Sequence, residues 1–298
     1  MTTALPDHEL IAPAWLDTIC PPTQPVQAAG DDAIERSAQS GMLRLKATLP
    51  ECRHLDAIAL EEAVDRLYRT LFDLLEESEH AHLLRIWNGV PGILDPMQLP
   101  TPALSRWERV APTHEPFDRY MAFNAGRSQA FRRWTRGTQQ PPTICPAATA
   151  VGHRGTDLQV HLLASDRPGI AYENPRQTPA YNYSPRYGPY PPIFARATRY
   201  EERLFISGTA SVVGEKSMHA DQLEPQLNET VNNLRCIAQQ AGEDATTLRH
   251  FRAYATDEQD LPVIAETLHQ HFPNIRSLEW MRADLCRPDL RVEIEATT

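Results

Sequence analysis

Residues 203–213 read RLFISGTASVV, and they open the stretch of sequence that decides the fold. Apolar and polar side chains alternate along them, as in a half-buried strand. From Leu223 to Ala241 apolar residues recur at three- and four-residue steps, and Gly242 follows as a stop signal, which predicts a helix. The rest of this last third holds a strand, a helix and two more strands, at 250–256, 260–272, 278–284 and 290–296. The order β, α, β, α, β, β predicts an α+β unit with helices on one face of a mixed sheet.

Two similar units are predicted upstream. In the first, an amphipathic helix over 59–79 lies between strand-like stretches at 42–50 and 83–93. In the second, a helix over 118–133 precedes two strands, which we expect to form a hairpin through the tight turn GHRGT. Those two strands are at 144–152 and 158–165.

The composition excludes several classes of protein. Of the 298 residues, 41% are hydrophobic and 23% charged, which is ordinary for a globular chain and enough for two or three small domains. Lys and Arg number 29 against 39 Asp and Glu, a net charge of −10, so no basic field exists to hold a polyanion and we expect no nucleic-acid partner. Five scattered cysteines without a CxxC pair predict free thiols in a reducing compartment and argue against structural zinc.

The N-terminal stretch has neither the basic start nor the apolar run of a secretory signal. No window approaches the roughly 20 apolar residues that a membrane span needs. We therefore expect a cytoplasmic protein with no membrane partner. Neither GxGxxG nor GxxxxGK[ST] occurs, so the sequence predicts no nucleotide cofactor, and we assign no metal.

One segment, residues 172–200, gathers six tyrosines and four arginines among prolines. Guanidinium groups that grip carboxylates, with phenol donors beside them, suit a ring-shaped substrate with two negative charges. The alternative is a proline-rich connector whose tyrosines cover apolar surface and whose arginines are solvated.

The last strand, LRVEIEA (290–296), places Glu293 and Glu295 on one face, at most about 7 Å apart. Two carboxyl groups so close divide into a proton donor and an ion if one of them is desolvated. The alternative is a solvated outer face of a terminal strand.

Four ordered blocks resemble signature blocks of the chorismatase family: YGPYPPIFARA (187–197), LFISGTASVVGEKSMH (204–219), QLNETVNNL (226–234) and ADLCRPDLRVEIEA (283–296). The upstream blocks RIWNGVPGI, FNAGRSQAF, PAATAVG and ENPRQ also resemble that family, so the resemblance spans roughly residues 40 to 298. That many ordered blocks are more specific than a single motif.

This family is distantly similar to the small trimeric RidA proteins. The resemblance implies a monomer built of three RidA-like (chorismate-mutase-like) α/β domains with pseudo-threefold symmetry. With proline clusters as candidate boundaries, we expect an extended N-terminal arm over 1–40 and domains over 41–100, 101–192 and 193–298. The active site is expected between the central and the last domain.

Chorismatases release pyruvate from chorismate, and the resemblance implies the same substrate here. Protonation of the enol ether forms an oxocarbenium ion, and by its place in the EIEA block Glu293 matches the family's acid. Attack of the ring hydroxyl then leads to 3-hydroxybenzoate, in some members with 4-hydroxybenzoate. Attack of water gives 3,4-dihydroxycyclohexa-1,5-dienoate instead.

The resemblance also assigns selectivity and binding residues. The residue seven before the acid separates the two outcomes, and here it is Cys286, the type that accompanies hydroxybenzoate formation. Ala210 in the SGTAS turn is the second selectivity position, where the hydroxybenzoate type favours glycine. The residues expected to bind the substrate carboxylates are Arg196, Tyr183, Arg186 and Tyr187. Glu215 stands where histidine is usual in that block.

Two other classes remain open from the sequence: a RidA-like imine-binding protein without chorismatase activity, and a non-catalytic interaction module that uses the helix at 59–79. Several arginines and tyrosines favour the chorismate enzyme, because a small imine needs only one carboxylate clamp.

Overall fold

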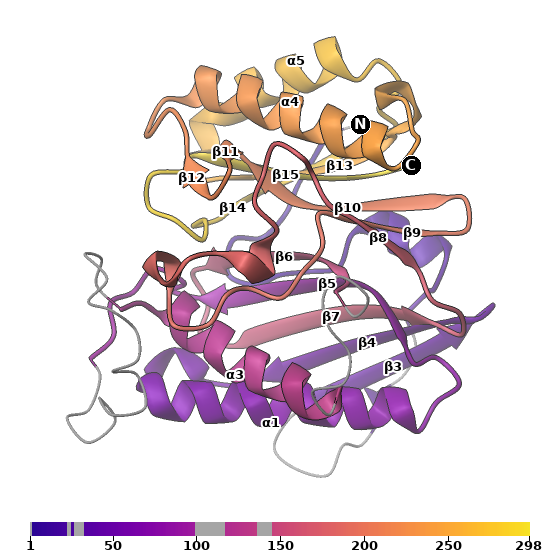
Figure 1. Cartoon of the computed structure of the whole chain (residues 1–298), viewed down its shortest axis with the longest axis vertical. Coiled ribbons are helices and arrows are strands. Elements are labelled where there is room, and N and C mark those ends of the chain that lie inside the picture. The colour runs from indigo at the N-terminus through magenta and orange to yellow at the C-terminus, as the bar shows by residue number, and fades with distance from the viewer. Residues whose placement is uncertain (1, 23–24, 27–32, 99–116, 136–144) are drawn as a thin grey trace.

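The computed structural model describes residues 2–22, 25–26, 33–98, 117–135 and 145–298. Two sheets stack face to face in it, and each carries its helices on the outer face (Figure 1). Strands and helices thus form four layers, which confirms the predicted α+β class.

The lower sheet in Figure 1 has six strands in the order β2-β3-β4-β7-β5-β6. These strands are β2 (Pro25–Val26), β3 (Ala33–Gln39), β4 (Met42–Leu49), β7 (Leu158–Ser165), β5 (His82–Pro91) and β6 (Ala147–His153). The helices α1 (Ala57–Glu76) and α3 (Arg119–Trp134) cover its outer face (Figure 1).

The upper sheet has seven strands in the order β1-β14-β13-β15-β10-β9-β8. These are β1 (Thr2–Ala4), β14 (Ser277–Arg282), β13 (His250–Ala255), β15 (Val292–Thr297), β10 (Arg203–Ala210), β9 (Ala197–Tyr200) and β8 (Ile170–Tyr172). The helices α4 (Leu223–Gln240) and α5 (Leu261–His271) cover it from above (Figure 1). A small hairpin, β11 (Val212–Val213) with β12 (Lys216–Ser217), follows β10.

Capping residues set where the two helices under the lower sheet begin, and a glycine sets where they cross. The side chains of Asp56 and Asp118 cap α1 and α3, because each accepts a backbone N–H of the first turn at 2.9 Å. The two helices approach closely at Gly126, where a Cβ would lie 2.3 Å from the carbonyl oxygen of Glu61. Glycine is therefore required at this crossing.

Three apolar clusters hold the layers together. One lies between the lower sheet and its helices, and a second between the upper sheet and α4 with α5. The third fills the space between the two sheets, with Trp87 and Leu163 from below and Phe205 and Met281 from above. The inner faces of both sheets are thus buried against each other.

The hairpin expected between residues 144–152 and 158–165 is wrong. Strand β5 lies between β6 and β7, parallel to the first and antiparallel to the second. The reason is that β5 is buried on both faces along nearly its whole length, so it takes a central place with a neighbour on either side.

The N-terminal segment also differs from the expected extended arm. Strand β1 pairs with β14, and β3 pairs with β4 in the lower sheet. Leu10 and Leu16 are buried in the core between the sheets, because an apolar side chain gains more there than in water.

Strands from the expected first and central domains share the six-stranded sheet. The domain boundaries and the threefold arrangement stay predictions. None of the described helices is long and apolar enough to cross a membrane.

Candidate active site

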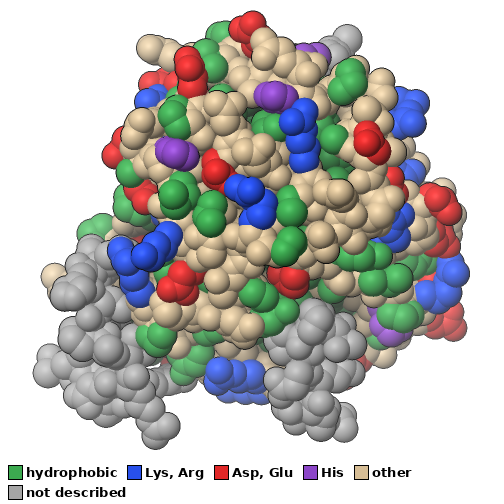
Figure 2. Space-filling view, turned by 45° about the horizontal axis from the view of Figure 1, so that its top comes forward, with side chains coloured by type: hydrophobic (Ala, Val, Ile, Leu, Met, Phe, Trp, Pro, Cys, Tyr) green, Lys and Arg blue, Asp and Glu red, His purple; other side chains and the backbone are tan. Residues whose placement is uncertain are grey.

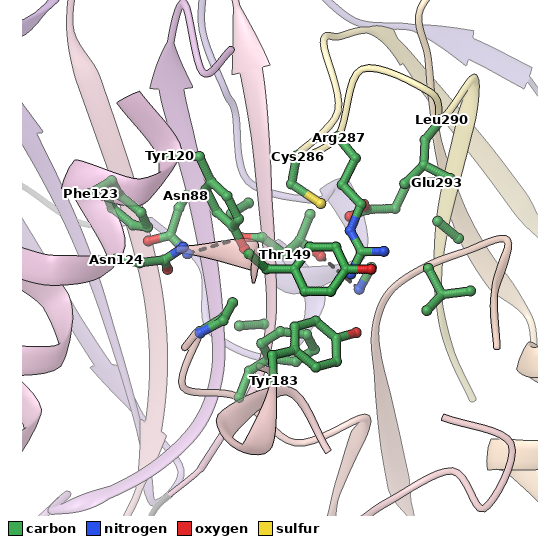
Figure 3. A pocket seen from close by; sticks show the side chains of 18 of the residues that line it. Asn88, Tyr120, Phe123, Asn124, Thr149, Tyr183, Cys286, Arg287, Leu290 and Glu293 are labelled. Carbon is green, nitrogen blue, oxygen red and sulfur yellow. Dashed lines mark hydrogen bonds between the residues drawn. The ribbon is translucent and has the colours of Figure 1, made fainter. Parts of the chain in front are cut away.

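A pocket opens beside β6, the edge strand of the lower sheet, where the two halves of the molecule meet, and elements far apart in the sequence line it (Figure 3). The lower half of the molecule contributes β5, β6 and α3. The upper half contributes β10, β15, the segment before β9 and the loop between β14 and β15. The site therefore exists only where both halves of the chain meet.

Glu293 on β15 faces this pocket and is 5% exposed. Its register partner on β10 is Ala210, and the pairing of these two strands shifts between Ile206 and Thr209. Gly208 lies in this irregular stretch, directly against the carboxyl group: a Cβ there would be 1.9 Å from Glu293 Oε1. A bulge and a glycine thus make room for the acid.

Burial, and after it the nearby charge of Glu295, raises the pKa of Glu293 to about 8. Arg85, Arg196 and Arg287 act in the opposite direction. A carboxyl group in this state keeps its proton at neutral pH and can donate it to a substrate.

Glu295 lies two residues further along the same face, and it is 4% exposed. The interpretation of this face as a solvated outer surface is therefore wrong. Its carboxylate contacts the lower sheet, where Arg85 Nη2 donates to Oε2 at 2.7 Å and Trp87 Nε1 donates to Oε1 at 2.8 Å. Thr149 Oγ1 donates to Oε2 at 2.7 Å.

Arg196 lines the pocket, and its guanidinium is held by the segment that precedes it. Its Nη2 donates to the hydroxyl of Tyr183 at 2.8 Å and to the carbonyl of Thr178 at 3.0 Å. Its Nε is buried and has no hydrogen-bond partner among the described residues. Because Arg196 lines the pocket, its guanidinium charge is near any anion that enters there.

The other expected binding residues divide into two groups. Tyr183 and Tyr187 line the pocket, with ring centroids 5.5 Å apart. Arg186 is exposed and does not line the pocket, and its guanidinium carbon lies 5.8 Å from the centroid of the Tyr187 ring. Neighbours in sequence thus have different surroundings, because Pro185–Tyr187 forms a 3-10 turn.

Arg287 is a pocket residue that the sequence analysis missed. Its guanidinium lies 4.1 Å from the Tyr187 ring centroid and 5.4 Å from that of Tyr183 (Figure 3). Its Nη1 donates to the carbonyl of Glu215 at 2.8 Å. The signal was its place directly after Cys286 in the block ADLCRPDL.

Glu215, the departure from the usual histidine, fixes the aromatic wall of the pocket. It accepts hydrogen bonds from the backbone N–H of Ser184 at 2.9 Å and from its Oγ at 2.8 Å. These bonds lower the pKa of Glu215. The β11–β12 hairpin is thereby joined to the segment that carries Tyr183.

Helix α3 and β5 form the opposite wall, which the sequence analysis also did not assign. Tyr120 and Asn124 face the pocket from α3 and Asn88 faces it from β5 (Figure 3). Arg127 of α3 also lines the pocket, and its Nη1 donates to the carbonyl of Ile193 at 2.8 Å. Its Nη2 is buried and lacks a hydrogen-bond partner in the described part of the chain.

The two expected selectivity residues both line the pocket. Ala210 lies across from Glu293, and the sulfur of Cys286 points into the cavity near Tyr120 (Figure 3). Burial, and then the neighbouring Glu293, raises the pKa of Cys286 to about 12. Cys286 is therefore a neutral thiol that shapes the cavity rather than a thiolate nucleophile.

Acidic and basic side chains are interspersed over the face that Figure 2 shows, with no continuous basic area among its described residues. No group of three or more His, Cys, Asp or Glu in the described ranges is arranged to hold a metal ion.

Fold and pocket together define an α+β enzyme whose buried glutamic acid lies among arginines. The family model of FkbO/Hyg5-like chorismatases, N-terminal part, matches residues 20–164. A 3-hydroxybenzoate synthase of Streptomyces hygroscopicus is 33% identical over 252 residues, which cover 78% of this chain and 68% of that protein. A chorismatase of Streptomyces rapamycinicus is 28% identical over 246 residues, 77% of this chain and 67% of that protein. The chain belongs to the chorismatase family.

One solved structure agrees with this assignment. A crystal structure of a chorismatase matches 93% of this chain and 80% of its own, with a TM-score of 0.76 and 25% identity. RidA from Psychrobacter sp. PAMC 21119 covers 43% of this chain at a TM-score of 0.36 and 17% identity.

Proposed function

We propose that this enzyme converts chorismate to 3-hydroxybenzoate and pyruvate, with 4-hydroxybenzoate as a minor second product. The observation that carries the proposal is Glu293, a buried acid in a pocket that the guanidinium groups of Arg196 and Arg287 also line. Chorismate has two carboxylates, an enol ether and a ring hydroxyl, so it needs both features. The 3-hydroxybenzoate synthase among the relatives supports the same product.

In the first step the Glu293 carboxyl group transfers its proton to the terminal methylene of the enol ether. A C–H bond forms, and the ether oxygen shares the positive charge of the resulting oxocarbenium ion. Protonation of carbon is slow, so an acid that is still protonated at neutral pH is an advantage. Glu293 becomes a carboxylate, which the arginines near it stabilise.

In the second step the C4 hydroxyl of the ring attacks C3, and the C3–O bond breaks with its electron pair going to pyruvate. The hydroxyl proton returns to Glu293, so the acid is regenerated. The ring epoxide that remains opens and loses its C–H proton to give the aromatic hydroxybenzoate. Atoms balance without water, and this path requires water to be kept from the oxocarbenium ion.

Carboxylate binding is assigned to Arg196 and Arg287, with Tyr183 and Tyr187 beside them. The free Nε of Arg196 supports this assignment, since a buried donor without a partner costs free energy until an acceptor arrives. The exposed position of Arg186 makes it the weakest of the four residues expected from the sequence.

A second candidate is hydrolysis to 3,4-dihydroxycyclohexa-1,5-dienoate and pyruvate. Ala210 favours it, because the hydroxybenzoate type prefers glycine at this position and the methyl group changes the wall beside Glu293. Cys286 favours the first candidate.

The test is to incubate the pure protein with chorismate, follow pyruvate with a coupled dehydrogenase and separate the ring products by chromatography. We expect pyruvate and mainly 3-hydroxybenzoate. Pyruvate with the diene diol would establish hydrolysis. Absence of pyruvate would reject both and leave an imine-binding protein as the alternative.

Glu293→Gln is the matching variant. The amide keeps the volume of the side chain but has no proton to give, so we expect pyruvate release to fall at least about a hundredfold with the fold intact by circular dichroism. Turnover within a few-fold of wild type would show that the acid lies elsewhere, and Glu295 would be examined next.

A further inference from the structure

The two carboxyl groups of β15 have opposite hydrogen-bond surroundings. Glu295 accepts from four donors: Arg85, Trp87, Thr149 and, at 3.2 Å, the hydroxyl of Tyr254. Among the described residues no donor bonds to the carboxyl group of Glu293, which lies against the backbone of Gly208. A carboxylate with four donors is stabilised as an ion, whereas a buried one without donors is not.

Thr149 fixes which way its own proton points. Its Oγ1 accepts hydrogen bonds from Arg85 Nη2 at 2.5 Å and from the backbone N–H of Gly208 at 3.0 Å. Its single hydroxyl proton is therefore left for Glu295 Oε2, at 2.7 Å. Arg85 and Trp87 can only donate, and the proton of Thr149 already points at Glu295, so a proton on either oxygen of Glu295 would compete with these donors.

We propose that Glu295 is a positioning residue: a buried permanent carboxylate, anchored by Arg85, Trp87 and Thr149, whose charge keeps the proton of the pair on Glu293. This rests on the proposed role of Glu293 as the acid. Two neighbouring carboxyl groups in a buried site do not both ionise readily. The negative charge therefore lies on Glu295, which has the hydrogen-bond donors, and the proton stays on Glu293, which faces the pocket.

Other charged and titratable groups face Glu293 from the elements around it. They are Arg85 on β5, Tyr120 on α3, Arg196 before β9, Tyr254 on β13, and Cys286 and Arg287 in the β14–β15 loop. The three arginines favour the ionised form of Glu293, so without Glu295 its proton would be lost at lower pH. Glu295 opposes these arginines.

The first test needs only wild type and Glu293→Gln. The infrared difference spectrum at pH 7, wild type minus Glu293→Gln, should show a carboxylic acid C=O band. Burial raises the pKa of Glu173 to about 7, but its own acid band is present in both proteins and cancels in the difference. Absence of an acid band from the difference spectrum would put the proton on another carboxyl group and would overturn the proposal. This readout does not depend on turnover.

The second test follows kcat/KM for pyruvate release against pH. Wild type should lose activity as pH rises through about 8. Glu295→Gln should lose it at a pH lower by about one unit or more, and recover at pH 5 to 6, because the arginines then act unopposed. Glu295→Asp keeps the charge, so its alkaline limb should stay nearer to that of wild type.

Arg85→Gln should act in the opposite direction. It removes a cation that favours ionised Glu293 and leaves the charge of Glu295, so the alkaline limb should move to higher pH. If Glu295→Gln does not fold, the infrared comparison of wild type with Glu293→Gln decides. The proposal would be overturned if the alkaline limb of the pH profile does not move, or if it moves in the same direction in Glu295→Gln and Arg85→Gln. A merely structural role of Glu295 does not predict shifts in opposite directions.

Glu279→Gln is the control. Glu279 is also a buried glutamate in an arginine pair, with Arg252 Nε at 2.9 Å, and it is not among the groups that act on Glu293. The Glu279→Gln variant should have a lower melting temperature than wild type and an unchanged pH profile of kcat/KM. If Glu293→Gln itself keeps its activity, the proposed acid is wrong, and the infrared result still reports separately on where the proton is.

Discussion

Arg196 and Arg186 are ten residues apart, and the structure gives them different surroundings. Arg196 is buried at the pocket with a free Nε, and Arg186 is exposed outside the lining. In Arg196→Ala a substrate carboxylate loses its partner, which costs about 3 to 5 kcal/mol, so KM for chorismate should rise at least about a hundredfold. Arg196→Lys should recover only part, because Lys cannot bind with two parallel hydrogen bonds.

Arg186→Ala is the matched control and should leave KM within about twofold, since an exposed guanidinium contributes little. Unchanged KM in the Arg196 variants together with a raised KM in Arg186→Ala would reverse the assignment and move the clamp to the exposed side of the segment.

Cys286 offers a test of product choice. Cys286→Ala removes a sulfur from the pocket and opens room of the order of one water molecule, about 30 Å³ of liquid volume. Water then competes with the ring hydroxyl, so the product should shift from 3-hydroxybenzoate toward the diene diol while total pyruvate release is largely kept. Chromatography of both products measures the shift.

Labelled water gives an independent check of the same step. In ¹⁸O water the intramolecular path retains the oxygen of the substrate, so wild-type hydroxybenzoate should carry no solvent label. Labelled hydroxybenzoate, or an unchanged product ratio in Cys286→Ala, would remove Cys286 from the selectivity mechanism.

At the scale of an element, the irregular stretch of β10 next to β15 positions the acid. Gly208→Ala would place a Cβ 1.9 Å from Glu293 Oε1 and 3.0 Å from Thr149 Oγ1. The acid must move, so we expect activity to fall at least about tenfold, together with a loss of about 1 to 3 kcal/mol in stability from overpacking. Turnover and denaturant unfolding measure the two effects. Full activity would show that the acid works equally well in another position.

Most helices and strands could be predicted because their hydrophobic periods are local. The predicted helix over 59–79 corresponds to α1 (Ala57–Glu76), and the predicted strand LRVEIEA (290–296) overlaps β15 (Val292–Thr297). The hairpin between β6 and β7 was wrong because pairing depends on which strand is buried on both sides, and β5 comes earlier in the chain. The order of strands in a sheet cannot be read from the short turn GHRGT, on which the predicted hairpin was based.

The site was predictable in proportion to how local its chemistry is. Alternation along one strand placed Glu293 and Glu295 together. It could not show that Glu295 meets Arg85, which is 210 residues away, so the solvated alternative stayed open. Arg287 and Tyr120 were missed for the same reason: each joins the pocket through the docking of two sheets.

For the whole molecule, Glu293 predicts a cost in stability that depends on pH. Unfolded, its pKa is the ordinary 4.5, and folded it is about 8. As pH rises from 4.5 to 8 the unfolded chain releases this proton and the folded protein does not, so stability falls across that window and is level above it. Glu293→Gln has no such proton and should be more stable than wild type at pH 8, by the order of a few kcal/mol.

Denaturant unfolding at pH 4.5 and pH 8 measures this difference. The gain from Glu293→Gln should be near zero at the lower pH and largest at the higher one. An equal gain at both would attribute it to packing of the amide and not to the buried proton.

The contact of Arg85 with Glu295 has a further meaning at this scale, because one partner belongs to each sheet. Two sheets packed only through apolar side chains can slide slightly against each other, because one apolar contact replaces another at little cost in free energy. A charged pair in the dry interior tolerates none, because a shift of one residue would strand both charges. The pair therefore acts as an alignment key: the two layers join in a single registration, and the reaction chamber is complete only in that registration.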